Sequence, residues 1–136
     1  MDKIHYRTGN HCCYRIMYHI VWCPKFRFFV LNDDIACSLK RILSAICKKC
    51  NYMIHAVEVM PDHIHLLIDC PQTEAPCAVV RKIKSLSAVY LFKKYPKLRR
   101  FYCKSGHLWS AGYFISTVGQ TDISVVENYI RYQKTR

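Results

Sequence analysis

Pro61-Asp62 separates two apolar runs, and this arrangement limits the possible folds more than any other part of the sequence. Residues 52–60 and 63–69 on either side are rich in aliphatic side chains, many of them β-branched, which favours strands. Proline followed by aspartate favours a tight turn. The segment therefore predicts two strands joined by a short turn.

The rest of the chain predicts helices and strands around this unit. Residues 11–22 are rich in β-branched and aromatic types and predict an earlier strand. Apolar residues recur at helical spacing over 33–50, after the capping residues Asn32-Asp33-Asp34. The later elements are expected to be a helix over about Glu74–Tyr95, a strand over Tyr113–Val118 and a last helix over about Asp122–Lys134. This order predicts an α+β fold of the ferredoxin-like βαββαβ type, with a four-stranded antiparallel sheet and an extra C-terminal helix.

Composition predicts an intracellular protein with a polyanionic partner. The chain has 136 residues and no repeat or linker, which predicts a single domain over residues 1–136. No apolar run is long enough for a membrane span and no signal-peptide pattern is present, so we expect a soluble, cytoplasmic protein. The net charge is +12, from 21 Lys and Arg against nine Asp and Glu. Such a surplus favours nucleic acid as the partner over a membrane.

Nine cysteines raise the possibility of metal or thiol chemistry. Cys47 and Cys50 form the one CxxC pair, but they fall at the end of a predicted helix. A reactive pair belongs at a helix N-terminus, where the dipole lowers the thiol pKa. A structural zinc site would need a second pair of ligands. We therefore expect most cysteines to be reduced and buried, and a zinc or thiol protein stays a third hypothesis.

Two pairs of side chains stand out as candidates for catalysis. His63 and His65 lie two residues apart on a predicted strand, so both imidazoles share one face and can chelate a metal ion. Tyr129 and Gln133 lie four residues apart on the last predicted helix, so they also share a face. Each pair alone is also consistent with a purely structural role.

Five blocks of sequence stand in order over nearly the whole chain. They are Tyr18-His-Ile-Val-Trp22 with Pro24-Lys-Phe-Arg27, Met60-Pro-Asp-His-Ile-His-Leu-Leu-Ile68, Gly106-His-Leu-Trp-Ser110, Tyr113-Phe-Ile-Ser-Thr-Val-Gly119, and Tyr129-Ile130 with Gln133. Together they resemble the single-stranded-DNA transposases of the insertion-sequence 200/605 family, which belong to the His-hydrophobic-His nuclease superfamily. Phe26 and Ser105 depart from residues common in that family.

The resemblance implies a role for each of four residues. His63, His65 and Gln133 would bind a divalent metal, and Tyr129 would attack the scissile phosphate to give a 5′-phosphotyrosine. Imidazole ligands by themselves favour Mn²⁺ or Zn²⁺, whereas the resemblance implies Mg²⁺ or Mn²⁺. It also implies a homodimer with shared active sites that binds hairpins at transposon ends. Asp62 is expected either to support the metal site or to serve only in the turn.

Basic residues in the second half of the chain, with two more after the first strand, predict a DNA-binding surface. Phe101, Tyr102 and Trp109 are interleaved with them and are candidates for base stacking, although burial in the core is at least as plausible for Phe101 and Trp109. The candidate DNA-binding residues are Lys25, Arg27, Arg81, Lys82, Lys84, Arg99, Arg100, Lys104 and Trp109.

The main alternative is a nucleic-acid-binding module on the same fold without catalysis, such as an RRM-like protein. An RRM carries an aromatic RNP1 motif, and none is present. A transposase of the three-carboxylate type is disfavoured because the chain has few acidic residues.

Overall fold

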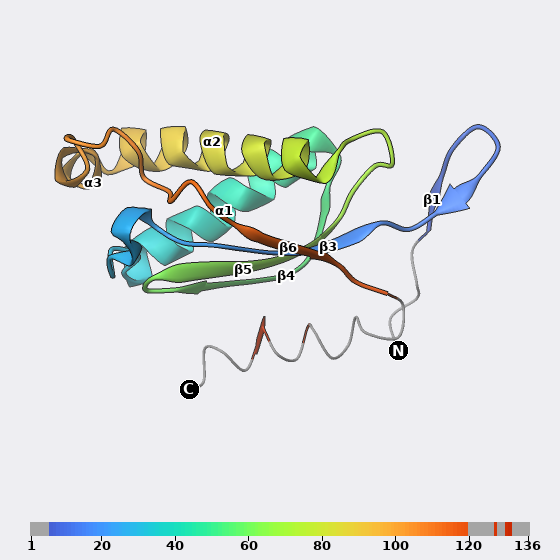
Figure 1. The fold of residues 1–136 in the computed structure, drawn as a ribbon, viewed down its shortest axis with the longest axis horizontal. Coiled ribbons are helices and arrows are strands. Elements are labelled where there is room, and N and C mark those ends of the chain that lie inside the picture. Colours follow the sequence, from blue (N-terminus) through green and yellow to red (C-terminus); the bar gives the residue numbers. More distant parts are fainter. Residues whose placement is uncertain (1–5, 120–126, 128–129, 132–136) are drawn as a thin grey trace.

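The computed structural model describes residues 6–119, 127, 130 and 131. Four strands form an antiparallel sheet in the order β4-β5-β3-β6. They are β3 (Met17–Trp22), β4 (Met53–Met60), β5 (His63–Asp69) and β6 (Phe114–Thr117). Two long helices, α1 (Asp33–Cys50) and α2 (Pro76–Lys94), lie on one face of this sheet (Figure 1). The predicted ferredoxin-like α+β fold is therefore confirmed.

Shorter elements occupy the two ends of the molecule. At one end β1 (Arg7–Thr8) and β2 (Cys13–Tyr14) pair in a separate ribbon (Figure 1). At the other end lie the 3₁₀ turn η1 (Lys25–Arg27) and the helix α3 (Pro96–Phe101) (Figure 1). None of the helices in the described part of the chain has the length and apolar character needed to cross a bilayer.

Local sequence accounts for the bounds of α1, which match the prediction. The Asn32 side chain accepts a hydrogen bond from the Ile35 backbone N–H at 2.9 Å and so caps the helix. Asp33 and Asp34 lie in the first turn, where negative charge is favourable. Asn51 ends the helix in the left-handed conformation, at φ 63°.

The predicted strand over 11–22 is wrong in its first half. Only Met17–Trp22 joins the main sheet, because it finds partners on both sides, in β5 and β6. Cys13–Tyr14 instead pairs with Arg7–Thr8, a two-residue segment outside the predicted strand. The two halves pair with different segments, which local composition does not reveal, and this divides the predicted strand into two.

Two prolines set helix bounds in the second half of the chain that differ from the prediction. The helix predicted from Glu74 begins at Pro76, because the residue before a proline is held extended and the proline itself fits the first helical turn. Residues 96–101, which lie between the predicted elements, form α3, again with a proline at the start. The predicted strand 113–118 is observed as β6, one residue shorter at each end.

The main hydrophobic core lies between the sheet and the helices. Ile64 and Leu66 of β5 are completely buried there, together with Leu39 and Leu43 of α1 and Ile83 of α2. The opposite face of the sheet carries a smaller cluster, in which Met17 and Leu67 pack with Ile130.

The predicted C-terminal helix falls mostly outside the described residues. Glu127, Ile130 and Arg131 are helical, and Tyr129 and Gln133 lie outside the residues that the structure describes.

Candidate active site

His63 and His65 lie side by side on β5, as their spacing predicts. Their ring centroids are 5.0 Å apart with the rings nearly perpendicular. Ile64 between them points into the core on the other face of the sheet. His65 is buried and His63 is half-buried, so the pair sits at the edge of the molecular surface.

Asp62 holds the ring of His63. Its Oδ1 lies 2.7 Å from His63 Nδ1, and its Oδ2 accepts a hydrogen bond from Arg27 Nε at 3.0 Å. Burial alone would raise the pKa of Asp62, but the hydrogen bonds with His63 and Arg27 outweigh it and hold that pKa below its ordinary value. Asp62 is therefore an ionised partner of His63 as well as a turn residue.

A third imidazole, which the sequence analysis missed, contacts His65. His19 Nε2 lies 3.2 Å from His65 Nδ1, and the two rings are stacked with centroids 5.4 Å apart. Burial, together with the nearby His63 and His19, lowers the pKa of His65 to about 4. Burial also lowers the pKa of His19. Both rings are neutral near pH 7, and a neutral imidazole has the lone pair that metal binding requires.

The strand register brings His19 to this site. Residue 19 lies on β3 opposite Leu67, two positions along β5 from His65, and on the same face. Alternation along residues 17–22 puts residue 19 on one of the two faces of the sheet. A histidine within a segment predicted to be a strand was the signal in the sequence that could have pointed to His19.

The two histidines open onto a hollow of about 540 Å³. Arg27, Ser110, Tyr113 and Phe114 also line it. Phe114 meets the His19 ring edge-on, with the centroids 6.0 Å apart. This hollow has the dimensions of a ligand site and combines imidazole, guanidinium and hydroxyl groups.

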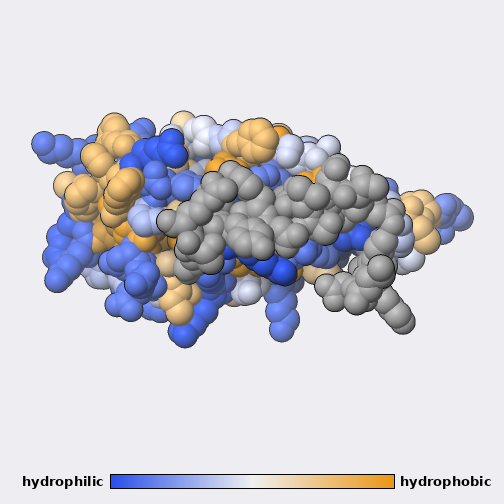
Figure 2. Space-filling view, turned by 90° about the horizontal axis from the view of Figure 1, so that it is seen from below, coloured by the Kyte–Doolittle hydropathy of each residue, from blue (hydrophilic) through white to orange (hydrophobic). Residues whose placement is uncertain are grey.

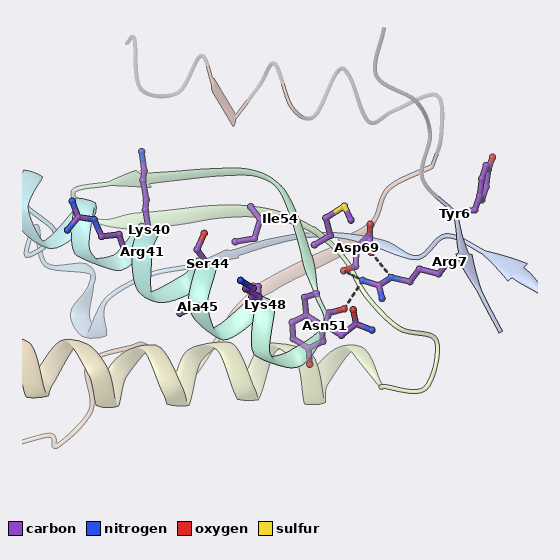
Figure 3. A pocket seen from close by; sticks show the side chains of 13 residues that line it. Tyr6, Arg7, Lys40, Arg41, Ser44, Ala45, Lys48, Asn51, Ile54 and Asp69 are labelled. Atoms are coloured by element: carbon purple, nitrogen blue, oxygen red, sulfur yellow. Dashed lines mark hydrogen bonds and ion pairs between the residues drawn. The ribbon is translucent and has the colours of Figure 1, made fainter. Parts of the chain in front are cut away.

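A larger hollow of about 960 Å³ lies elsewhere, between α1, β4 and the N-terminal segment (Figure 3). Arg7 at its edge is engaged by Asp69 and by the Asn51 carbonyl. None of the predicted site residues lines it. We favour the smaller hollow as the active site, because chemically active groups converge there.

Four of the predicted DNA-binding residues have internal partners, and one of them is Arg27, which donates to Asp62. Trp109 is only 6% exposed and its indole N–H donates to Ser87 Oγ at 3.0 Å. Its ring therefore belongs to the core, which corrects the prediction that Trp109 stacks on DNA bases. Lys84 Nζ donates to the Ser110 carbonyl at 2.6 Å and to the next two carbonyls, which ties α2 to the loop before β6. Lys82 is paired with Glu74.

The other predicted basic residues lie mostly at one end of the molecule. Arg99 and Arg100 are exposed on α3, and Lys104 follows. The backbone at Lys25 is held at the same end, because the Lys25 carbonyl accepts a hydrogen bond from Tyr102 Oη at 3.0 Å. Arg81 is exposed on α2.

The cysteines give no sign of a metal or redox site. All nine are free. Cys47 is buried at the end of α1, and burial, with Cys50 nearby, raises the pKa of its thiol to about 12. Within the described part of the chain, no three His, Cys, Asp or Glu side chains are grouped so as to hold a metal ion.

Comparison with known proteins gives the family. The family model described as "Transposase IS200 like" matches residues 12–133. The ISDra2 transposase TnpA of Deinococcus radiodurans is 35% identical over 127 residues, which cover 93% of this chain and 90% of that protein. The transposase for insertion sequence element IS200 of Salmonella typhimurium is 28% identical over 123 residues, covering 90% of this chain and 80% of that protein.

Solved structures agree with this assignment. A crystal structure of a putative transposase from Deinococcus radiodurans has a TM-score of 0.77 and 32% identity, covering 93% of this chain and 97% of that one. A REP-associated tyrosine transposase bound to a REP hairpin shares the fold, with a TM-score of 0.60 at 15% identity over 96% of this chain and 69% of that one. The sequence blocks and the fold thus agree with the family match, and the chain belongs to the IS200-like transposase family.

Proposed function

We propose that this protein cleaves and rejoins single-stranded DNA at transposon ends through a covalent tyrosine–DNA intermediate. The observation that carries the proposal is the pairing of His63 and His65 beside a hollow, each with its Nδ1 in a hydrogen bond. Tyr129 is the proposed nucleophile. The alternative, a DNA-binding module without catalysis, has no use for two oriented imidazoles.

The donor set fits a divalent metal. His63 and His65 would hold it, with Gln133 as the third protein ligand, and Mg²⁺ or Mn²⁺ is the proposed ion. Two imidazoles are suitable donors, and Gln133 is proposed as the third because the described part of the chain groups no three His, Cys, Asp or Glu side chains that could hold a metal ion. When bound, such an ion would offset the charge of the scissile phosphate and orient it for in-line attack.

Asp62 and His19 would set the orientation of the two ligands. With Asp62 accepting from His63 Nδ1–H, the lone pair of His63 is on Nε2. If His65 Nδ1–H likewise donates to His19 Nε2, the lone pair of His65 is also on Nε2. Both metal-binding nitrogens are then fixed by neighbours within the chain.

Attack by Tyr129 accounts for breakage and rejoining without another energy source. A bond forms between the phenolic oxygen and phosphorus, the bond to the 3′ oxygen breaks, and that oxygen leaves as a free hydroxyl. The product is a 5′-phosphotyrosine, which is still a phosphodiester, so a 3′-hydroxyl can reverse the step without ATP. Ile130, next in sequence, is buried against Met17 and Leu67 on the histidine-bearing face, which supports a role for this segment at the site.

A DNA hairpin and a second subunit are the proposed partners. The net charge of +12 and the basic end of the molecule favour DNA. The REP-associated transposase was solved with a hairpin, and its shared fold makes a hairpin the ligand that we propose here. In the proposed homodimer, Tyr129 of one subunit acts beside the His63 and His65 of the other.

The decisive experiment uses single-stranded transposon-end DNA with Mg²⁺ or Mn²⁺ and a denaturing gel. We expect a covalent adduct from the wild-type chain, none from Tyr129→Phe, and nearly equal DNA affinity for both, because the hydroxyl is the nucleophile and contributes little to binding. Mixing Tyr129→Phe with a His63→Ala/His65→Ala chain should restore cleavage if sites are shared between subunits. An adduct on the phenylalanine variant would exclude Tyr129, and wild-type binding without an adduct would favour the non-catalytic module.

A further inference from the structure

Three exposed phenylalanines form one surface at the end of the molecule that carries η1 and α3. Phe26 is 67% exposed, Phe28 44% and Phe101 58%. The ring of Phe28 lies between the other two, with centroid distances of 5.6 Å to Phe26 and 5.4 Å to Phe101. We call these three residues the phenylalanine patch. Exposed aromatic side chains in contact with one another are a sign of a binding surface.

The backbone holds this patch in place. Phe26 and Arg27 both have positive φ, 62° and 54°, a conformation unfavourable for residues with a Cβ. Such backbone persists where its surroundings enforce it and is concentrated at functional sites. Here Lys25 N–H donates to the Leu108 carbonyl at 2.7 Å, and Tyr102 Oη donates to the Lys25 carbonyl. The patch is therefore presented on a fixed turn.

Basic residues flank the patch along the chain. Lys25 Nζ lies 5.6 Å from the centre of the Phe26 ring. The segments 23–31 and 96–110, from which the patch is built, contain no acidic residue. Their basic residues are Lys25, Arg27, Lys97, Arg99, Arg100 and Lys104. At this end of the molecule Figure 2 shows orange apolar groups directly beside blue hydrophilic ones.

Flat aromatic faces among cations match unpaired nucleic-acid bases joined by phosphates. An apolar protein partner would not need the cations, and duplex DNA would not expose the faces of its bases. The patch also connects to the candidate active site: Arg27 contacts Asp62, which contacts His63, and Arg27 lines the same hollow as both histidines. A strand that crosses the patch can therefore continue into the hollow.

We propose that unpaired bases next to the scissile phosphate stack on Phe26, Phe28 and Phe101, while Arg99 and Arg100 hold the neighbouring phosphates. This rests on the proposed function for the identity of the strand, but the stacking itself does not require cleavage.

The test uses the full chain and a short single-stranded oligonucleotide containing a fluorescent adenine analogue that stacking quenches. The variant Phe26→Leu/Phe101→Leu keeps apolar side chains and removes two rings. Tyr90→Leu is the matched control, because Tyr90 is a similarly exposed aromatic on α2 outside the patch. We expect wild type and control to quench the analogue, and the double variant to lose quenching and roughly tenfold in affinity.

Salt dependence separates stacking from charge. The double variant removes no charge, so its slope of log K against log salt should equal that of the wild type. Arg99→Gln/Arg100→Gln should reduce the slope by roughly 0.7 for each lost phosphate contact and keep the quenching. These results are obtained even if Tyr129 makes no adduct.

Unchanged quenching and affinity in the phenylalanine variant, with its fold intact by circular dichroism, would overturn the proposal. A variant that keeps its DNA affinity but changes its oligomeric state would overturn it too, and would make the patch a contact between copies. Equal affinity for single strands and blunt duplex would also count against stacking.

Discussion

The two faces of the sheet carry different kinds of side chain, although the same strands build both. On the helix-covered face, Ile64 and Leu66 are completely buried among aliphatic residues. On the other face, His65 lies between them in sequence and shares a hydrogen bond with His19. The alternation of β5 therefore places packing and chemistry back to back, one residue apart.

This difference shows which side-chain properties each face of the sheet requires. The helix-covered face needs volume and apolar character, because close packing supplies its stability. The histidine-bearing face needs particular partners, because a polar group that leaves water must be paired. His63 with Asp62, His65 with His19 and Asp69 with Arg7 are such pairs.

Substitution of neighbouring residues on β5 should separate the two faces most clearly. Leu66→Ala removes a completely buried side chain and should lower the free energy of unfolding by about 2–5 kcal/mol. His65→Ala should abolish the covalent adduct while costing roughly 1 kcal/mol of stability, from one lost hydrogen bond. Urea denaturation and the adduct assay measure the two effects.

Leu66→Met serves as the control for this pair, since it keeps the volume and should cost under about 1.5 kcal/mol. An active His65→Ala enzyme under limiting metal, or a fully stable Leu66→Ala protein, would break the contrast between the faces.

Asp69 tests whether polar pairs also stabilise the histidine-bearing face. It is buried, its Oδ1 accepts from Arg7 Nε at 2.6 Å and its Oδ2 lies 3.1 Å from His55 Nε2. Burial alone would raise the pKa of Asp69, but the hydrogen bonds with His55 and Arg7 outweigh it, and the pKa is lowered. We expect Asp69→Asn to destabilise the protein by about 1–3 kcal/mol at neutral pH in thermal or urea unfolding.

The sign of the pH dependence follows from the lowered pKa. Ionised Asp69 contributes stability above its unfolded pKa of about 3.9, and this contribution is lost as pH falls through the lower folded value. The difference between wild type and Asp69→Asn should therefore shrink in acid. If the difference in unfolding free energy between wild type and Asp69→Asn stays constant down to the acid transition, the charge on Asp69 does not contribute to stability.

The smallest expected effect concerns His19, which would position His65. His19→Leu removes the hydrogen-bond partner of His65 Nδ1 and should weaken Mn²⁺ binding roughly tenfold in titration calorimetry. His19→Gln offers a replacement amide and should keep most of the affinity. Equal losses in both variants, accompanied by equal losses of melting temperature, would indicate packing alone.

Local rules predicted much of this molecule. The cap at Asn32 and the helical spacing that follows gave correct bounds for α1, and the turn at Pro61-Asp62 gave correct bounds for β5. Alternation placed His63 and His65 on one face, and the ordered motifs indicated the family that the comparisons confirm. The proposed roles of Tyr129 and Gln133 stay predictions.

What sequence by itself determined here is set by neighbours along the chain: caps, turns, alternation and motif spacing. Tertiary structure decided the rest, because strand register and burial depend on residues far apart in sequence. Pairing of β3 with β5 brought His19 to His65, and packing against Ser87 took Trp109 into the core. The phenylalanine patch arose in the same way, since Phe28 and Phe101 come into contact only once the chain has folded.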